Sequence, residues 1–420
     1  MKHSRRVVLA LTVLVGSYFQ SAAQVNSNYQ VAPWRGFKKA AVTYTFDDNT
    51  GGQVPIAVPL FDRYNYKVTL FTITNSNPNW ALLRTASANG HEVTSHTVTH
   101  ADLSAITVAQ QVTELQNSQT TIRTNVPTAK CETIAYPYCR IGDRASIQSY
   151  YIAGRVCSGT IIPPNPTDFY QLGSTSTGSA NVTQTAAHFN AKVDAARTSG
   201  GWCMFLTHGI NNDGGYSPTQ STEIAGHLAY VDANKADFWV GTFSEVVKYV
   251  KERMALNVSE TPVTSDSLRL AVTDNLPNNV YNVPVTIRRQ LPTGWTNARL
   301  WSGSTLIPST ISTASGVRYV VFEVEPDQGI MYLAKSSVVA STRTTGVALP
   351  LQSWPNPFDN STRLELPGRF AYSVYALDGK LVESGQSVDA VELGKNLAAG
   401  AYSVRISQGD RVAGATIIKK

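Results

Sequence analysis

The 420-residue sequence has little charge and no long apolar run. Only 15% of its residues are charged and 42% are hydrophobic. This composition excludes a disordered chain, which needs more charge and fewer apolar residues. The longest apolar run lies at the N-terminus and is too short to span a bilayer, so we expect no transmembrane segment. The 29 glycines follow no three-residue period, which excludes a collagen-like chain.

Clusters of basic residues are also absent. The formal net charge of +6 comes from 35 basic and 29 acidic residues. Lys2, Arg5 and Arg6 lie in a segment that we expect to be removed, and +6 less these three charges leaves +3. A charge this small, spread over the whole chain, gives no surface that would follow a phosphate backbone. We therefore expect no nucleic-acid partner.

Residues 1–23 have the pattern of a secretory signal peptide. Basic residues come first, residues 7–15 are apolar, and residues 21–23 are small, as cleavage requires. The mature chain is then expected to begin near Gln24, outside the cytoplasm. The alternative is a short N-terminal anchor.

Cysteine is scarce, and all of it lies in the first half of the chain. The four residues are Cys131, Cys139, Cys157 and Cys203. They contain no CxxC spacing, which disfavours a metal site built from them. A secreted chain can form disulfides, and four cysteines allow three pairings, among which the sequence does not choose.

Residues 30–255 alternate strand-like and helix-like patterns. Strand patterns lie at 40–46, 68–73 and 202–206, and helical spacing lies at 108–122 and 243–254, where Lys248, Lys251 and Arg253 are off the apolar face. This alternation predicts an α/β domain with a parallel sheet, open or closed into a barrel. In such sheets the chemistry lies at the carboxyl ends of the strands, where Asp47, Asp48 and His208 occur.

The rest of the chain reads as all-β. Short β-runs at 280–287 and 317–324, separated by proline and glycine, predict a small β-sandwich over 258–342. We expect a spacer there, with a sugar-binding module as the alternative. Residues 345–420 form a further unit, with a hairpin turn at 377–380 and strands at 401–406 and 415–420.

Three short motifs carry the chemistry: TFDD at 45–48, HTVTH at 96–100 and LTHG at 206–209. We expect the two histidines, four residues apart, to share one face of a helical turn, so that both reach one cation. A carboxylate from another strand completes a set of two histidines and one aspartate with open positions. A cation there lowers the pKa of its water, the second aspartate takes a proton, and a distant histidine gives one.

With AYPYC at 135–139, these motifs occur in an order that resembles the polysaccharide deacetylase family (NodB homology, carbohydrate esterase family four), over residues 38–255. The resemblance implies a distorted (β/α) barrel and metal-dependent hydrolysis of N-acetyl, sometimes O-acetyl, groups on polysaccharides. It also implies the roles of single residues: Asp47 as general base, Asp48, His96 and His100 as metal ligands, and His208 as general acid. Zn²⁺ is the expected ion, with cobalt, nickel or other divalent ions as alternatives.

The same resemblance implies three substrate contacts. Leu206 would form an apolar wall around the acetyl methyl. Tyr138, which follows Pro137, would donate its backbone N–H to the tetrahedral oxyanion, a role that contributes roughly 3 to 4 kcal/mol. Among the aromatic residues, Tyr136 and Tyr138 are the best placed to contact a sugar ring, ahead of Trp80, Tyr170, Trp202 and Trp239.

The chain departs from the family pattern in two places. The arginine that often precedes the Pro-Tyr pair and contacts the base is missing, and Arg140, Arg144 or Arg155 are the open substitutes. The aspartate that orients the catalytic histidine is also not found. Asp168 and Asp237 compete for that role, and for each of them an ordinary turn or cap is an equal alternative.

The last unit resembles the C-terminal sorting domain of the type IX (Por) secretion system. The resemblance rests on residues 353–358, 374–380, 397–404 and a final strand that ends in lysine. It implies a Bacteroidetes protein that the type IX machinery exports across the outer membrane, secreted or attached to the cell surface. Another carbohydrate-binding or spacer sandwich is the alternative.

Together these patterns predict an α/β distorted (β/α) barrel followed by two small all-β sandwich-like domains. The predicted ranges are a signal peptide at 1–23, the deacetylase domain at 30–255, the sandwich at 258–342 and the sorting domain at 345–420. The predicted activity is removal of N-acetyl groups from a chitin- or peptidoglycan-like polymer. The alternatives are an O-acetyl, xylan-type esterase on the same site, and a non-catalytic carbohydrate-binding protein on a deacetylase scaffold. The missing arginine motivates the second alternative, and the five intact acidic and histidine residues argue against it.

Overall fold

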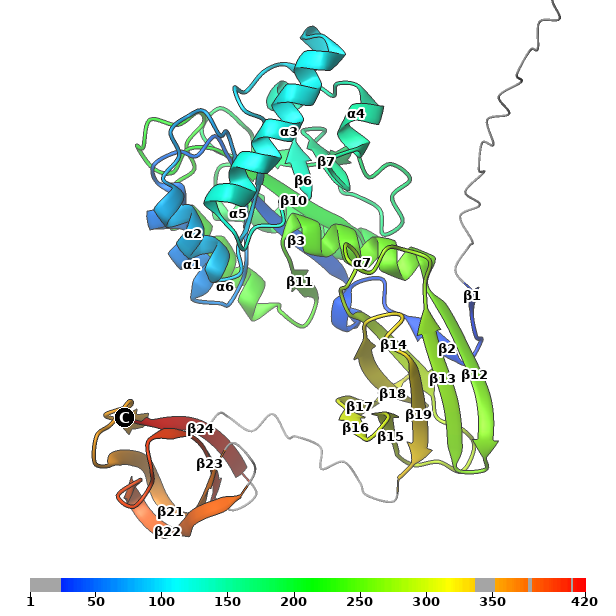
Figure 1. The fold of residues 1–420 in the computed structure, drawn as a ribbon, viewed down its shortest axis with the longest axis vertical. Coiled ribbons are helices and arrows are strands. Elements are labelled where there is room, and N and C mark those ends of the chain that lie inside the picture. Colours follow the sequence, from blue (N-terminus) through cyan, green and yellow to red (C-terminus); the bar gives the residue numbers. More distant parts are fainter. Residues whose placement is uncertain (1–23, 337–351, 377–379, 409–410) are drawn as a thin grey trace, which may run out of the picture. The chain divides into compact units, whose positions relative to one another are not determined.

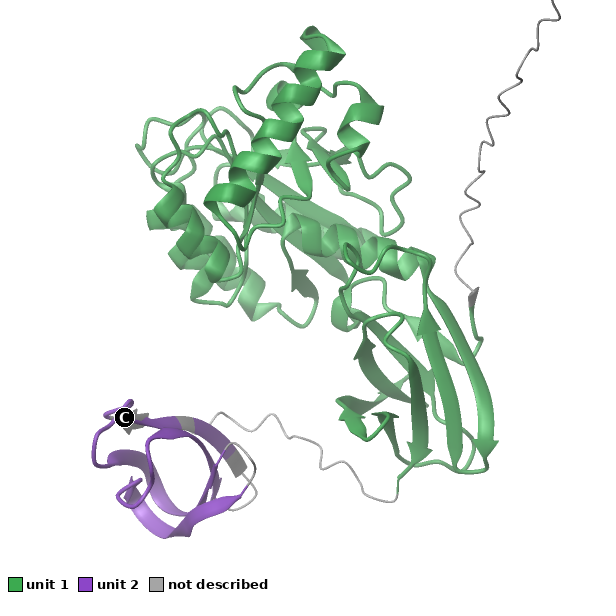
Figure 2. Cartoon of the chain, viewed as in Figure 1, with its two compact units in different colours: residues 1–338 green, residues 339–420 purple. Residues whose placement is uncertain are grey.

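A computed structural model describes residues 24–336, 352–376, 380–408 and 411–420. The chain divides into two compact units, residues 1–338 and 339–420 (Figure 2). The predicted signal peptide, and most of the predicted hairpin turn at 377–380, lie outside the described residues. Within the described part, no helix has the length and apolar character to cross a membrane.

The first unit is built on a parallel sheet that curves into a nearly closed barrel (Figure 1). Its strand order is β8-β7-β6-β5-β4-β3-β10-β9, and β11 pairs with β3. The strands are β3 (Ala40–Asp47), β4 (Thr69–Thr72), β5 (Glu92–Ser95), β6 (Thr133–Ala135), β7 (Ala153–Val156), β8 (Leu172–Gly173), β9 (Thr175–Ser176), β10 (Trp202–Thr207) and β11 (Phe238–Val240). Only Ser174 separates β8 from β9, so the chain itself joins the two edges of the sheet. The predicted distorted (β/α) barrel is confirmed.

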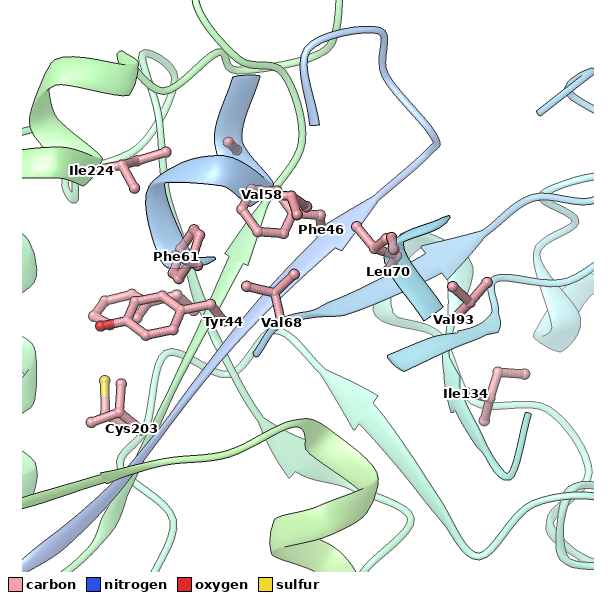
Figure 3. Packing of buried hydrophobic residues seen from close by; sticks show 14 of the residues in the cluster. Tyr44, Phe46, Val58, Phe61, Val68, Leu70, Val93, Ile134, Cys203 and Ile224 are labelled. Atoms are coloured by element: carbon pink, nitrogen blue, oxygen red, sulfur yellow. The ribbon is translucent and has the colours of Figure 1, made fainter. Parts of the chain in front are cut away.

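Helices follow the barrel strands and cover them. They are α1 (Val58–Asp62), α2 (Trp80–Ala88), α3 (Val108–Asn125), α4 (Arg144–Gln148), α5 (Ala186–Ser199), α6 (Ser221–Ala233) and α7 (Phe243–Ala255), with short turns η1 (Arg35–Phe37), η2 (Gln53–Ala57), η3 (Leu103–Ala105) and η4 (Pro137–Cys139). Every residue of β3 is buried, because both faces of a parallel strand are covered. Figure 3 shows part of this core, where Tyr44 of β3 packs on Phe61 of α1 with ring centroids 4.8 Å apart.

The helix predicted at 243–254 is confirmed as α7, but basic residues off its apolar face also contact other parts of the unit. Lys248 is buried and forms an ion pair with Glu132, and the Lys251 ammonium lies over the rings of Phe169 and Tyr281. The reason is that α7 contacts the barrel through β3 and the neighbouring sandwich through β14. A helix with partners on both sides leaves little of its surface to solvent.

The β-sandwich of the first unit consists of two sheets, β1-β12-β13-β19-β15-β16 and β17-β18-β14-β2. Its strands are β1 (Gln24–Val25), β2 (Tyr29–Val31), β12 (Asn257–Thr264), β13 (Ser267–Thr273), β14 (Val285–Gln290), β15 (Ala298–Ser302), β16 (Thr305–Ile307), β17 (Ser309–Ala314), β18 (Val317–Val324) and β19 (Ile330–Lys335). The strand expected at 280–287 begins only at Val285. Val280 instead donates its N–H to the carbonyl of Pro277, which forms a turn.

The N-terminal segment contributes a strand to each sheet of the sandwich. β1 pairs in parallel with β12, and β2 pairs antiparallel with β14. The sequence analysis did not predict these strands. They place barrel and sandwich in one compact unit, with residues 24–31 before the barrel and the other sandwich strands after it.

The second unit is a single antiparallel sheet in the order β20-β21-β23-β24, with β22 on β21. Its strands are β20 (Gln352–Trp354), β21 (Thr362–Ala376), β22 (Leu381–Leu393), β23 (Gly400–Gln408) and β24 (Arg411–Lys419). Its core contains Phe358, Leu364, Val374, Val404 and Ile417.

Candidate metal centre and catalytic site

The candidate residues gather at the carboxyl ends of the barrel strands. Asp47 ends β3 and Asp48 follows it, His96 follows β5, and His208 follows β10. All of these residues line one cavity of about 460 Å³. The parallel arrangement explains the convergence, because residues far apart in sequence meet where parallel strands end.

Asp48, His96 and His100 form a group whose ligand atoms all lie within 4.8 Å of one another. Nε2 of His96 is 3.4 Å, and Nε2 of His100 is 3.6 Å, from Oδ1 of Asp48. Oδ1 of Asp48 is buried without a hydrogen-bond partner among the described residues. Such an orphaned oxygen between two imidazoles fits a divalent cation, which prefers this set of ligands.

A hydrogen bond orients His96 for this role. Its Nδ1 lies 2.8 Å from the carbonyl oxygen of Ala135, which can only accept, so Nδ1 carries the proton. The lone pair is then on Nε2, the atom that faces Asp48. Outer contacts of this kind fix the tautomer of metal-binding histidines.

The helical turn expected at 96–100 is absent. The segment is an irregular loop in which Thr97 and His100 have left-handed backbones, with φ of 67° and 61°. Glu114 of α3 holds the loop by accepting the N–H groups of Val98 and Thr99 at 2.8 and 2.9 Å. The loop, and not helical periodicity, therefore brings the two imidazoles together.

The local electrostatics favour the protonation states that metal ligands need. Burial opposes ionisation of Asp48, but the attraction of the neighbouring His96, His208 and His100 side chains outweighs it and lowers the pKa of the carboxyl. Burial lowers the pKa of His100. An ionised carboxylate and a neutral imidazole are the binding forms.

Arg155 of β7 supplies the missing arginine. Its Nη2 lies 2.6 Å from Oδ2 of Asp47 and its Nη1 lies 3.1 Å from Oδ1, a bidentate pair in which both side chains are buried. The other two substitutes lie elsewhere. Arg140 pairs with Asp102, and Arg144 pairs with Asp168.

His208 has no carboxylate behind it. Its Nε2 is 3.8 Å from Oδ2 of Asp48, and its Nδ1 is buried with no partner in the described part of the chain. Asp168 is engaged by Arg144, and Asp237 pairs with Lys39 at 2.9 Å. No contact of either aspartate with His208 is found among the described residues.

The expected oxyanion donor lies in a tight turn after β6. Pro137 begins this turn, and Tyr138 has a left-handed backbone with φ of 55°. Its N–H finds no acceptor among the described residues. The Tyr138 ring is 64% exposed and lies 4.7 Å from the ring of His100. Leu206 is buried and lines the same cavity.

A disulfide between Cys139 and Cys157, with Cα atoms 5.7 Å apart, ties this turn to the end of β7. Cys131 and Cys203 are buried free thiols. Of the other aromatic candidates, Tyr136 also lines the cavity but is buried, and Trp202 belongs to the core.

Three cavity residues were missed by the sequence analysis: Ser176, Asn181 and Tyr216. Each is an isolated residue in a segment without a recognisable motif. No sequence signal distinguishes such residues, and only the fold brings them to the site.

Comparison with known proteins finds a family that is similar to part of the barrel. Residues 35–151 match the family described as Polysaccharide deacetylase. The chain is 28% identical over 333 residues to a gellan lyase of a Bacillus species. The aligned region covers 73% of this chain but only 13% of the gellan lyase.

Two solved structures are similar to about half of this chain. A putative polysaccharide deacetylase from Mycobacterium smegmatis is 15% identical with a TM-score of 0.44, covering 53% of this chain and 93% of its own. A family 4 acetyl xylan esterase from Clostridium thermocellum is 16% identical with a TM-score of 0.37, covering 49% of this chain and 89% of its own. Residues 35–151, which are similar to the polysaccharide deacetylase family, lie within the part of the chain that forms the barrel and carries Asp47, Asp48, His96 and His100.

Proposed function

We propose that the protein is a metal-dependent hydrolase that removes N-acetyl groups from an acetylated amino-sugar polymer, chitin-like or peptidoglycan-like. One observation carries the proposal: a three-ligand group of two histidines and one aspartate shares a cavity with an arginine-held aspartate and a further histidine. This set matches the requirements of metal-assisted acyl transfer.

The ligands Asp48, His96 and His100 would hold a divalent cation, Zn²⁺ being our choice, which lowers the pKa of a water and polarises the acetyl carbonyl. Asp47, fixed by Arg155, accepts the proton of the attacking water. The free N–H of Tyr138 donates to the oxygen on which negative charge develops. Leu206 packs against the methyl group.

His208 favours an amide substrate. An amine leaves poorly as an anion, so a C–N bond breaks only when a positioned acid protonates the nitrogen. Nε2 of His208 faces the site at 3.8 Å from Asp48 and is placed to give that proton. An O-acetyl, xylan-type esterase on the same residues is the second candidate, because an ester uses the same water, base and oxyanion donor.

The test is acetate release from a panel of acetylated polymers. Protein loaded with Zn²⁺, protein after chelation, and the Asp48→Ala variant are compared on N-acetylglucosamine oligomers and on acetylated xylan. Release that requires both the metal and Asp48, and that is faster from the N-acetyl substrate, supports the proposal. Faster release from xylan favours the esterase. Polymer binding without release, in protein shown to hold metal, would replace the hydrolase with a binding protein.

We further propose that the protein acts outside the cell, exported by the type IX machinery through residues 345–420. The sequence patterns at both ends support this, as does the folding of residues 339–420 as a separate compact unit. The test compares export of the full chain and of a chain lacking residues 345–420 in a Bacteroidetes host with this machinery. Equal export of both chains would overturn the proposal.

A further inference from the structure

Two exposed tyrosines line the cavity of the candidate site. Tyr138 is 64% exposed and Tyr216 is 62% exposed, although large aromatic side chains usually bury more of their surface. Tyr138 lies beside His100 on the metal side. Tyr216 lies beside His208, with ring centroids 5.1 Å apart and perpendicular planes. The two rings therefore occupy different parts of the cavity.

The loop that carries Tyr216 is rigidly held. Asp213 accepts the N–H groups of Gly52 and Gly215, each at 2.9 Å. Gly209 donates its N–H to the carbonyl of Tyr216 at 3.1 Å. Tyr216 is thus fixed from both sides while its ring stays in solvent, an arrangement that suits a preformed binding surface.

The next residue, Ser217, connects this loop to a second one. Ser217 is buried, and its Oγ donates to the carbonyl of Thr177 at 2.9 Å and accepts the N–H of Ala180 at 3.1 Å. The two loops pack so closely that a Cβ on Gly178 would lie 1.8 Å from the carbonyl oxygen of Ser217. The loops after β9 and β10 therefore form one wall.

Asn181 of this wall lines the cavity, and its side chain has its donors used and its acceptor unused among the described residues. Its Nδ2 donates to the carbonyl of Thr177 and to Oγ of Ser217, each at 2.9 Å, so both amide hydrogens are used. No donor among the described residues reaches Oδ1, and Asn181 lines the cavity. A ligand at this position must bring a hydrogen-bond donor.

We propose that Tyr216 and Asn181 form the subsite for the sugar residue that carries the leaving nitrogen. The inference rests on the proposed function, in which His208 protonates that nitrogen. Because Tyr216 contacts His208, a sugar bound at the leaving-group side lies against its ring. The apolar face of a pyranose packs on the tyrosine, and Oδ1 of Asn181 accepts a hydrogen bond from the scissile amide N–H or from a hydroxyl of the same sugar.

Kinetics separate this subsite from the reaction centre. With tetra-N-acetylchitotetraose, we expect Tyr216→Ala to raise KM about fivefold to tenfold, and Tyr216→Phe to restore most of the affinity. Asn181→Leu should raise KM about threefold to tenfold. The metal-dependent hydrolysis of 4-nitrophenyl acetate, which has no sugar, should fall less in either variant than the hydrolysis of the tetrasaccharide. For Asn181→Leu, a loss confined to N-acetyl substrates identifies the amide N–H as donor, whereas an equal loss on acetylated xylotetraose identifies a hydroxyl.

Two controls match these variants. Val182 is 84% exposed and adjoins Asn181 without lining the cavity, so Val182→Ala tests the loop alone. Tyr332, on β19 of the sandwich, is another exposed tyrosine. Neither Val182→Ala nor Tyr332→Ala should change KM.

Binding of the tetrasaccharide is also measured by calorimetry in the Asp47→Asn protein. This variant lacks the proposed base, so binding is measured separately from hydrolysis. Weaker binding on loss of Tyr216 or Asn181 supports the subsite even if no polymer is hydrolysed. The subsite is overturned if binding and KM are unchanged in both variants. It is also overturned if the Asp47→Asn protein binds neither tetra-N-acetylchitotetraose nor acetylated xylotetraose. If the wild-type protein with metal did not hydrolyse 4-nitrophenyl acetate, that result would instead count against the proposed function.

Discussion

Arg155 and Asp47 form the most deeply buried ion pair of the site, with side chains 1% and 2% exposed. Removing one partner of such a pair leaves an uncompensated buried charge, which costs about 3 to 5 kcal/mol. Nε of Arg155 has no partner among the described residues, so the guanidinium is committed to Asp47 and to Oγ1 of Thr45. Arg155 thereby fixes the orientation of the Asp47 carboxylate, the proposed base.

We predict that Arg155→Ala lowers kcat on acetylated oligomers by at least tenfold and lowers the free energy of unfolding by about 3 kcal/mol. Arg155→Lys should keep part of the stability but lose the bidentate geometry, so its kcat should remain low. The measurements are steady-state kinetics and urea unfolding. Arg144→Ala is the matched control, because its pair with Asp168 is partly exposed to solvent and is worth about 1 kcal/mol or less. An Arg155→Ala variant with wild-type kcat would contradict this role.

The sequence predicted the residues of the site better than their partners. Asp47, Asp48 and His208 follow recognisable buried strands, so their convergence was predictable. Arg155 lies within a four-residue strand next to β6, and nothing in its neighbourhood distinguishes it from Arg140 or Arg144. Spatial adjacency of two strands selects it, and a single sequence does not contain that information.

Glu252 of α7 is a buried ionisable residue outside the site. It is buried where α7 meets the sandwich, and its Oε2 has no partner in the described residues. Burial, followed by the nearby carboxylates of Asp274 and Glu325, raises the pKa of Glu252 well above its usual range. The folded protein therefore holds a proton that the unfolded chain releases above about pH 4.3.

It follows that stability falls as pH rises from about 4.3 towards the raised pKa of Glu252. We predict that Glu252→Gln, which keeps the shape and cannot ionise, removes this fall and stabilises the protein at neutral pH by about 1 kcal/mol or more. Urea unfolding at mildly acidic, neutral and mildly alkaline pH measures the free energy of unfolding of the wild type and of Glu252→Gln. Parallel stability profiles for the two proteins would show that Glu252 does not titrate in this range.

At the scale of elements, the catalytic turns share left-handed backbones. Asp48 has φ of 73°, and Thr97, His100 and Tyr138 are also positive. Such residues cost about 1 to 3 kcal/mol each and persist where surrounding structure enforces them. This explains why helical spacing misled the sequence analysis at residues 96–100. A strained loop can present two histidines four residues apart as well as a helix can.

The turn η2 holds the backbone directly before one of these left-handed residues, Asp48. Gln53, its first residue, is buried and donates Nε2 to the carbonyls of Asp47 and His208, the latter at 3.0 Å. It therefore joins the ends of β3 and β10, which carry Asp47 and His208, the proposed base and acid. Single-turn π-helical segments of this kind occur often at functional sites.

We predict that Gln53→Leu lowers kcat about tenfold with a smaller change in KM, because the base and acid lose their fixed separation. The measurement is the kcat and KM split on an acetylated oligomer. Gln171→Leu serves as control, since this exposed glutamine bonds only to Asp168. If KM rose with kcat unchanged, Gln53 would serve in substrate binding and not in positioning.

At the scale of the whole molecule, the length of a segment does not decide whether it folds with the rest of the chain or as a separate unit. The short N-terminal segment 24–31 belongs to both sheets of the sandwich, whereas residues 339–420 form a unit of their own. Strands of two and three residues have too few positions to show periodicity, so no sequence pattern predicts the strands in residues 24–31.

We predict that a chain ending at residue 338 keeps the kcat, KM and melting temperature of the first unit. Deletion of residues 24–31, although much shorter, should lower the melting temperature by several degrees, because each sheet of the sandwich loses a strand. Differential scanning calorimetry and acetate release compare the two deletions. Greater damage from the C-terminal deletion would contradict the division into units.

The pairing of residues 24–31 also sets an order of events during synthesis. These residues leave the ribosome before the barrel, but their partners at 257–258 and 287–289 follow more than two hundred residues later. Until then two short β-edges are unpaired and open to wrong partners. The first described segment to be made is thus among the last to fold, and closing so long a loop is slow. A chaperone that holds this segment during synthesis or export would protect the protein when it is most prone to aggregate.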